Sequence, residues 1–125
     1  MIVKLRTSKK TMEIFSAIKA KENLEPFILS KIAIALSVRR GPLAELLDYK
    51  TDNDGLELNR QTIFGEHDLL FRCLIVNNEK RIIHEDEYFP KLVKAHLERG
   101  AELLANEKRY TKDFYNYLCK LDEGI

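Results

Sequence analysis

Residues 25–40 read EPFILSKIAIALSVRR. Pro26 suits the first turn of a helix, where its missing N–H needs no partner. Arg39 and Arg40 fall in the last turn, where cations complement the helix dipole, and Gly41 with Pro42 follows as a stop. Apolar side chains occupy most of the circumference of this helix, which is typical of a helix that packs against neighbours on several sides. We therefore predict a central helix, with apolar residues Phe27, Ile28, Leu29, Ile32, Ala33, Ile34, Ala35 and Leu36.

The residues before this helix predict a strand and a first helix. Residues 2–8, IVKLRTS, alternate apolar and polar side chains, as in a short strand or an extended arm. Ser8 can cap a helix over about residues 9–21, and Asn23 can end it. This strand-helix-helix order resembles that of ribbon-helix-helix DNA-binding proteins, in order alone, because about eighty more residues follow.

The residues after the central helix predict more helices. Five residues recur at a spacing of three or four and make one seam: Phe89, Val93, His96, Gly100 and Leu104. On this seam the glycine would let another helix approach closely. The predicted segments are a short helix over 42–49, a turn over 50–55, a helix over 68–81 ending at Asn77-Asn78, an irregular stretch or arm over 82–89, a helix opened by Pro90 and running to about 106, and a last helix capped by Thr111.

The composition fits one domain of 125 residues, with 45% hydrophobic and 33% charged residues. It shows no apolar run long enough for a transmembrane helix and no signal peptide, so we expect a cytoplasmic protein without a membrane partner. The predicted fold class is mainly α. We expect a single compact helical domain over 1–125, of about five helices with one or two short extended segments and an N-terminal strand-helix-helix order.

Positive charge is concentrated near the N-terminus. Residues 1–40 hold nine Lys or Arg against three Glu, a net of +6, so the formal total of +1 leaves −5 for the rest. A local basic area can attract an anionic partner even on a nearly neutral molecule, although charge clusters are often only solvated surface. The predicted DNA-binding residues, which could neutralise phosphates without reading bases, are Lys4, Arg6, Lys9, Lys10, Lys19, Lys21, Arg39 and Arg40.

Residues 56–68 read LELNRQTIFGEHD and concentrate polar groups. Gly65 can make the turn into the following helix, and carboxylates just after it suit the positive end of the dipole. Asp68 also lies four residues before Arg72, a favourable helical pair. We predict a helix-start or assembly motif made of Asn59, Arg60, Gly65, Glu66, His67 and Asp68.

Catalytic and metal sites find little support in the sequence. We see no phosphate-binding glycine loop, nucleophile elbow or zinc-ligand spacing, and the acidic turn lacks the first and last ligands of a calcium loop. We therefore predict no catalytic residue, no metal and no cofactor. Cys73 and Cys119 fall in apolar patterns, so we expect buried reduced thiols, and on the seam His96 should be packed or at an interface.

The whole chain resembles the DndE family of the bacterial DNA phosphorothioation system. The stretches that carry the likeness are TSKKTMEIFSAIKAKENLEPFILSKIAIALSV (7–38) and GLELNRQTIFGEHDLLFRCLIV (55–76). The resemblance implies a part in replacing a non-bridging phosphate oxygen of DNA with sulfur, which a cysteine desulfurase supplies while an ATP-dependent protein and an ATPase take part. It also implies a small helical homo-tetramer without a catalytic centre that binds nicked double-stranded DNA.

Three hypotheses follow. In the first, the chain is a non-enzymatic DNA-binding subunit of the phosphorothioation machinery. In the second, it is an adaptor that docks the cysteine desulfurase and other phosphorothioation proteins, with an exposed HEDEYF (84–89) as docking surface and DNA binding incidental. In the third, it is an enzyme that handles phosphate or cuts DNA with Glu66, His67 and Asp68.

Overall fold

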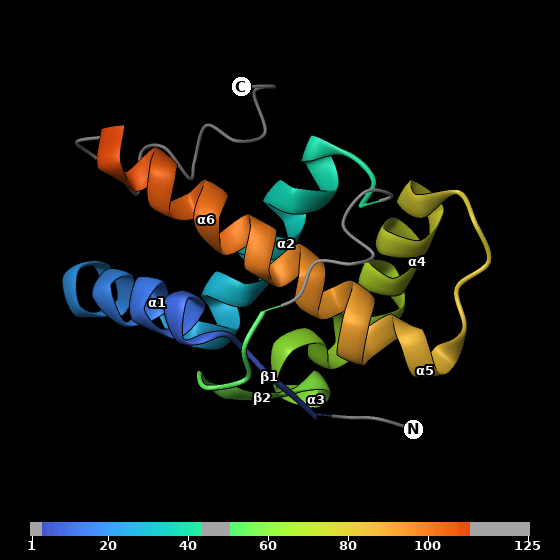
Figure 1. The fold of residues 1–125 in the computed structure, drawn as a ribbon, viewed down its shortest axis with the longest axis horizontal. Helices are drawn as coiled ribbons and strands as arrows, with labels where there is room; N and C mark the ends of the chain where they lie inside the picture. The colour runs from blue at the N-terminus through green and yellow to red at the C-terminus, as the bar shows by residue number, and fades with distance from the viewer. Residues whose placement is uncertain (1–3, 44–50, 111–125) are drawn as a thin grey trace.

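The computed structural model describes residues 4–43 and 51–110. The predicted order is confirmed, since a strand and two helices come first and the rest is mainly helical (Figure 1). The predicted helix over 42–49 falls largely outside the described residues, and the one after Thr111 wholly so. The elements are β1 (Lys4–Arg6), α1 (Lys9–Glu22), α2 (Pro26–Arg40), β2 (Glu57–Asn59), α3 (Arg60–Phe64), a 3-10 turn (Gly65–His67), α4 (Asp68–Glu79), α5 (Glu85–Glu87), a π-helical segment (Tyr88–Val93) and α6 (Lys94–Tyr110).

Helix α2 is central, as its sequence predicts. It packs most extensively on α6, which crosses it in Figure 1, and it also contacts α1, α3 and α4. Pro26 stands in its first turn, and Arg39 and Arg40 stand in its last. The closest approach is at Gly100 of α6, where an added Cβ would lie 1.8 Å from the backbone oxygen of Ala33. The predicted seam of α6 is buried along its length.

The N-terminal elements form the predicted strand and capped helix. Ser8 caps α1 by accepting a hydrogen bond from the Thr11 N–H, and Asn23 ends the helix in a left-handed conformation. Strand β1 pairs antiparallel with β2, which places Leu5 opposite Leu58. Both leucines are buried, so the two strands close the core on this side.

Three predictions for residues 73–89 are wrong. Helix α4 runs through Asn77-Asn78 to Glu79 and ends with Lys80 at a φ of 56°. Residues 85–89 are not an arm, because helix α5 begins at Glu85 and the aromatic pair Tyr88 and Phe89 is buried. Cys73 lies on the surface of α4 rather than in the core.

Pro90 lies inside a helix instead of opening it. A proline has no N–H to donate, and its ring clashes with a carbonyl in a regular helical turn. Here the turn widens into the π-helical segment Tyr88–Val93, a local change that accommodates such a residue. Helices α5 and α6 therefore continue into one another. No helix within residues 4–43 and 51–110 is long and apolar enough to cross a membrane.

Candidate nucleic-acid interface

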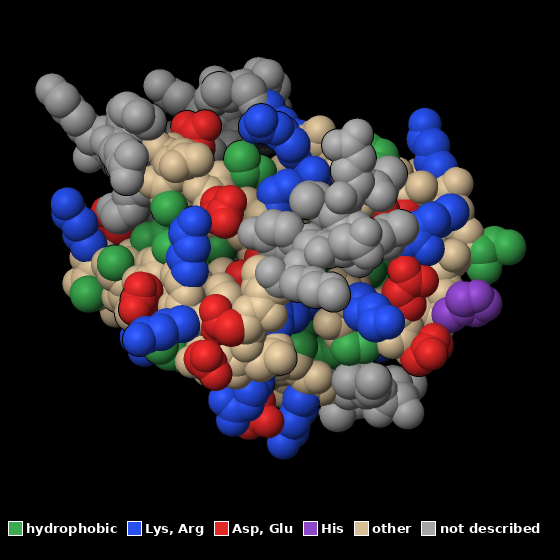
Figure 2. All heavy atoms as spheres, in the orientation of Figure 1, with side chains coloured by type: hydrophobic (Ala, Val, Ile, Leu, Met, Phe, Trp, Pro, Cys, Tyr) green, Lys and Arg blue, Asp and Glu red, His purple; other side chains and the backbone are tan. Residues whose placement is uncertain are grey.

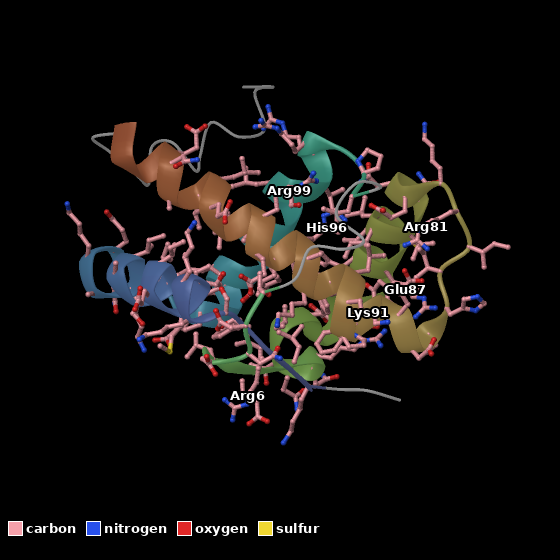
Figure 3. All side chains as sticks on the ribbon, viewed as in Figure 1. Arg6, Arg81, Glu87, Lys91, His96 and Arg99 are labelled. Atoms are coloured by element: carbon pink, nitrogen blue, oxygen red, sulfur yellow. The ribbon has the colours of Figure 1, made fainter. Side chains whose placement is uncertain are left out.

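Four of the predicted DNA-binding residues lie along the first strand and the start of α1. Lys4 and Arg6 are exposed while Leu5 between them is buried, because successive side chains of a strand point to opposite faces. Lys9 and Lys10 follow at the exposed start of α1. We call these four residues the strand-edge cations. Figure 3 shows Arg6 at the edge of the molecule, beside the two strands.

The strand-edge cations keep their charge available to solvent. Lys10 Nζ lies 3.2 Å from Glu102, but the two side chains are 69% and 43% exposed. Ion pairs of this kind contribute little, about 0 to 1 kcal/mol, and exchange readily for another anion. Arg6 opposes Glu57 across the two strands and donates a long hydrogen bond of 3.4 Å to the Gly55 carbonyl.

The other four predicted cations lie elsewhere. Lys19 and Lys21 are exposed near the end of α1, and Arg39 and Arg40 at the end of α2. In Figure 1 the far ends of these two helices point left and up, away from β1 at the lower edge. Figure 2 shows basic and acidic side chains interspersed over the face in view. The structure therefore does not unite all eight residues in one area.

The start of α1 is itself occupied by a carboxylate. Glu98 of α6 accepts hydrogen bonds from the Ser8 N–H at 2.8 Å, the Ser8 hydroxyl at 2.6 Å and the Thr11 hydroxyl at 2.5 Å. A helix start can hold an anion, but this one is already filled from within the chain. The sequence gives no local signal for Glu98, which is 90 residues from Ser8. A DNA phosphate near the start of α1 would therefore be contacted by lysine and arginine side chains.

The motif over 59–68 forms the turn between α3 and α4. Asn59 caps α3, with its side-chain oxygen accepting a hydrogen bond from the Gln61 N–H at 2.8 Å. Gly65 ends α3 at a φ of 51°, a backbone conformation that glycine adopts without cost. Glu66 and His67 then lie exposed in the 3-10 turn, and Asp68 begins α4.

The predicted pair of Asp68 with Arg72 is replaced by another. Arg60 donates to both oxygens of Asp68, at 2.7 and 2.8 Å, and Arg72 instead pairs with Glu85 at 2.5 Å. A guanidinium fork matches a carboxylate in this two-bond geometry, and the Asp68 contact raises the pKa of Arg60.

Aromatic residues complete this group. Arg60 also donates to Glu85 at 3.3 Å, and the guanidiniums of Arg60 and Arg72 lie 5.2 and 4.9 Å from the ring of Tyr88. We call Arg60, Asp68, Arg72, Glu85 and Tyr88 the arginine cluster. It joins α3, α4 and the α5 region, which accounts for Arg60 and Asp68 of the motif without a catalytic role. Glu85 and Tyr88 were missed because their segment was expected to be irregular.

The acid-base residues of the motif do not converge. Glu66 and His67 side chains are 87% and 53% exposed, while the carboxylate of Asp68 is engaged by Arg60. Among residues 4–43 and 51–110, no group of three or more His, Cys, Asp or Glu could hold a metal ion.

The comparisons with known proteins decide the family. A model described as DndE, DNA sulphur modification protein DndE, matches residues 4–112. The chain belongs to the DndE family. Among solved structures, a similar one is the crystal structure of DndE from Escherichia coli B7A involved in DNA phosphorothioation modification. The match covers 83% of this chain and 97% of the Escherichia coli chain, with a TM-score of 0.68 and 22% sequence identity. This similarity shows a shared fold. No curated protein matched.

This DndE-family chain also contains a buried polar relay. Arg99 donates to the Ser37 hydroxyl at 2.8 Å, Ser37 lies 2.8 Å from His96 Nδ1, and His96 Nε2 lies 3.3 Å from Glu79. Because a carboxylate only accepts, His96 Nε2 donates to Glu79, and Nδ1 of the neutral ring then accepts from the Ser37 hydroxyl. Glu79 also accepts from the Leu43 N–H. His96 and Arg99 lie centrally, beside α2 (Figure 3).

The relay has the residue types of a catalytic Ser-His-carboxylate triad, but a substrate cannot reach it. Ser37 and His96 are fully buried, and Glu79 is 8% exposed. Burial, helped by Arg99, lowers the pKa of His96 to about 3, so the ring is neutral at physiological pH. The relay therefore ties α2, α4 and α6 together and offers no nucleophile to a substrate. The prediction that His96 is packed is confirmed.

Proposed function

We propose that this chain is a non-catalytic subunit of the DNA phosphorothioation machinery that contacts duplex DNA through the strand-edge cations. The observation that carries the proposal is four exposed cations within residues 4–10 of a protein whose family acts in DNA sulfur modification. Lysine and arginine contacts with phosphates give affinity without sequence preference. That mode suits a protein that works on the DNA backbone.

The arginine cluster and the buried relay support the non-catalytic part of the proposal. Both use their polar groups to hold helices together, and the relay is closed to solvent. An enzyme acting through Glu66, His67 and Asp68 would need the three groups to converge on a phosphate. Glu66 and His67 lie 3.6 Å apart on the surface, but Asp68 is held by Arg60. The three groups therefore do not converge, and we propose no enzymatic role.

Further parts of the proposal come from the family resemblance. We propose nicked duplex as the preferred DNA, a homo-oligomer such as a tetramer as the assembly, the cysteine desulfurase with other phosphorothioation proteins as partners, and the cytoplasm as the location.

The chain supplies a matched test of the DNA contact. One variant changes the strand-edge cations Lys4, Arg6, Lys9 and Lys10 to Glu, and the control changes the four remote cations Lys19, Lys21, Arg39 and Arg40 to Glu. The change of net charge is the same in both. Binding of a nicked duplex and of an intact duplex is measured by gel shift at physiological salt, with circular dichroism as a check of folding.

We expect the strand-edge variant to lose at least tenfold in affinity, and more than the control loses. Equal losses would show that only overall charge matters. Unchanged binding by the strand-edge variant would refute the interface.

The adaptor hypothesis is weakened at its expected surface. Within HEDEYF, Tyr88 and Phe89 are buried, while Glu85 and Glu87 are paired with arginines. Figure 3 shows Arg81 beside Glu87 at this end of the molecule. An adaptor would remain the better description if the strand-edge variant still captured the desulfurase and still supported DNA modification.

A further inference from the structure

Helix α4 carries an apolar surface that the described part of the chain leaves uncovered. Leu69, Leu70 and Leu74 are 70%, 54% and 49% exposed, and Cys73 lies among them. Ile82, which is 83% exposed, follows in the loop after the helix. Single exposed apolar residues are ordinary, but a contiguous group of them marks an interaction site. In Figure 1, α4 lies at the opposite end of the molecule from α1.

The exposed residues share one side of the helix. With 3.6 residues per turn, positions 69, 70, 73, 74 and 77 fall within an arc of about 140°, and Cys73 is the middle position along its length. Asn77 is exposed on this arc, whereas Ile75 and Glu79 on the other side are buried. We call this arc the α4 face. Its borders are polar at both ends of the helix.

The ends of the α4 face carry opposite charges. Glu66, with its side chain 87% exposed, lies just before the helix, and the exposed Lys80 lies just after it. The two residues are equally far from Cys73 in sequence, seven positions each way. An antiparallel copy of the same helix, related by a two-fold axis at Cys73, would therefore place each Glu66 opposite a Lys80. Antiparallel helix dipoles favour the same arrangement.

We propose that the α4 face binds a second copy of this chain in an antiparallel helix pair centred on Cys73. The contact is isologous, so the leucines of each copy cover those of the other, and the two Glu66–Lys80 pairs fix the direction. This inference deepens the proposed homo-oligomer by naming where two copies meet, and it does not depend on DNA contact.

The pairing makes a geometric demand on Cys73. Helices pack with axes about 8 to 10 Å apart, and Cα atoms lie about 2.3 Å from each axis. Residues facing each other across the axis therefore have Cα atoms about 3.4 to 5.4 Å apart, and the upper part of this range overlaps the roughly 4.4 to 6.8 Å that a disulfide spans. Two Cys73 thiols at the axis should form a disulfide readily when an oxidant is added.

The first test is oxidation of the full chain without DNA. Cys119, the other cysteine, is changed to Ser, and diamide takes two electrons and two protons from a pair of thiols to form the disulfide. The control combines this background with Cys73→Ser and Ser16→Cys, which moves the sole thiol to an exposed position on α1. We expect the covalent dimer to form at least tenfold faster through Cys73 than in the control.

The second test needs no thiol. Leu70→Glu with Leu74→Glu, both on exposed positions, should lower the assembled mass in sedimentation while the circular dichroism stays that of the folded chain. Glu66→Lys and Lys80→Glu should each weaken assembly, because like charges then meet, and the two together should restore it. A parallel pair or an unrelated partner helix would show no such rescue.

The outcomes separate this inference from the proposed function. Cross-linking no faster than in the control, or an assembly unaffected by the leucine changes, would overturn the α4 pairing even if the protein is an oligomer. A protein that is a monomer at all concentrations would overturn both the pairing and the proposed assembly. Either result leaves the DNA test of the strand-edge cations standing.

Discussion

His96 is fully buried and is hydrogen-bonded at both ring nitrogens. Its pKa is about 3 in the folded chain, against an ordinary value of 6.5. Between these values the unfolded chain binds a proton that the native chain does not, so the free energy of unfolding increases with pH. The contribution is complete above pH 6.5 and is lost as pH falls toward 3.

We predict that His96→Gln flattens the acid side of the stability profile. Removing the ionisable ring removes its pH-dependent contribution to the free energy of unfolding. The pKa difference limits this contribution to about 5 kcal/mol between pH 3 and 6.5. Urea unfolding of both proteins at intervals between pH 3.5 and 8 measures it. The curves should converge toward low pH, and parallel curves would mean that His96 does not titrate in this way.

Several residue-scale features were predictable because their cause is local. Ser8, Asn23 and Pro26 act within a few positions of themselves, and each was found in the predicted role. Glu98 and the pairing of Arg60 with Asp68 were not predicted. Those partners meet only through the fold, or compete with a nearer candidate such as Arg72.

At the scale of elements, the crossing of α2 and α6 depends on Gly100. A Cβ there would lie 1.8 Å from the Ala33 oxygen and 2.3 Å from its carbonyl carbon, both backbone atoms that cannot move aside. Alanine favours a helix over glycine by about 1 kcal/mol, but the helices would have to separate. Forced packing typically costs about 1 to 3 kcal/mol and sometimes more.

We predict that Gly100→Ala lowers the free energy of unfolding by about 2 kcal/mol or more. Gly65→Ala is the matched control: nothing lies within 4 Å of its added Cβ, and only its φ of 51° is strained. That change should cost about 1 to 2 kcal/mol. Denaturant unfolding measures both, and a Gly100 variant as stable as the wild type would show that the helices do not touch there.

The sequence pattern predicted the long helices but not the join between α5 and α6. The periodicity of the α6 seam marks a buried face whatever precedes it. Three acidic residues in a row, Glu85–Glu87, resemble a solvated arm, and Pro90 resembles a helix start. The π-helical turn places the acidic run and Pro90 inside one continuous helix. The spacing of apolar residues does not indicate such a turn.

For the whole molecule, charge was predictable along the chain but not in space. The N-terminal excess of +6 divides among β1, the ends of α1 and the end of α2, which lie on different sides (Figure 1). The direction that a helix takes after it leaves a strand depends on packing with later residues. Which cations act together could therefore be decided only from the structure.

We predict that DNA affinity is salt-dependent in proportion to the strand-edge cations. Each phosphate neutralised contributes about −0.9 to the slope of log affinity against log salt concentration. Changing Lys4, Arg6, Lys9 and Lys10 to Ala should flatten the slope by up to about 3.6, and changing the four remote cations should flatten it less. A salt series of binding isotherms measures both slopes. Equal slopes in the two variants would show that the strand-edge cations contribute no more than the remote cations.

The hydrogen bonds of Glu98 to Ser8 and Thr11 also set an order of events in synthesis. A chain is made from its N-terminus, so β1 can pair only after β2 (Glu57–Asn59) has been made. Ser8 can bond to Glu98 only after 90 further residues. Contacts between distant residues form slowly because long loops must close first. The segment that carries the strand-edge cations therefore lacks these contacts until nearly the whole protein has been made. During that time it lies next to the nucleic acids that surround a nascent chain.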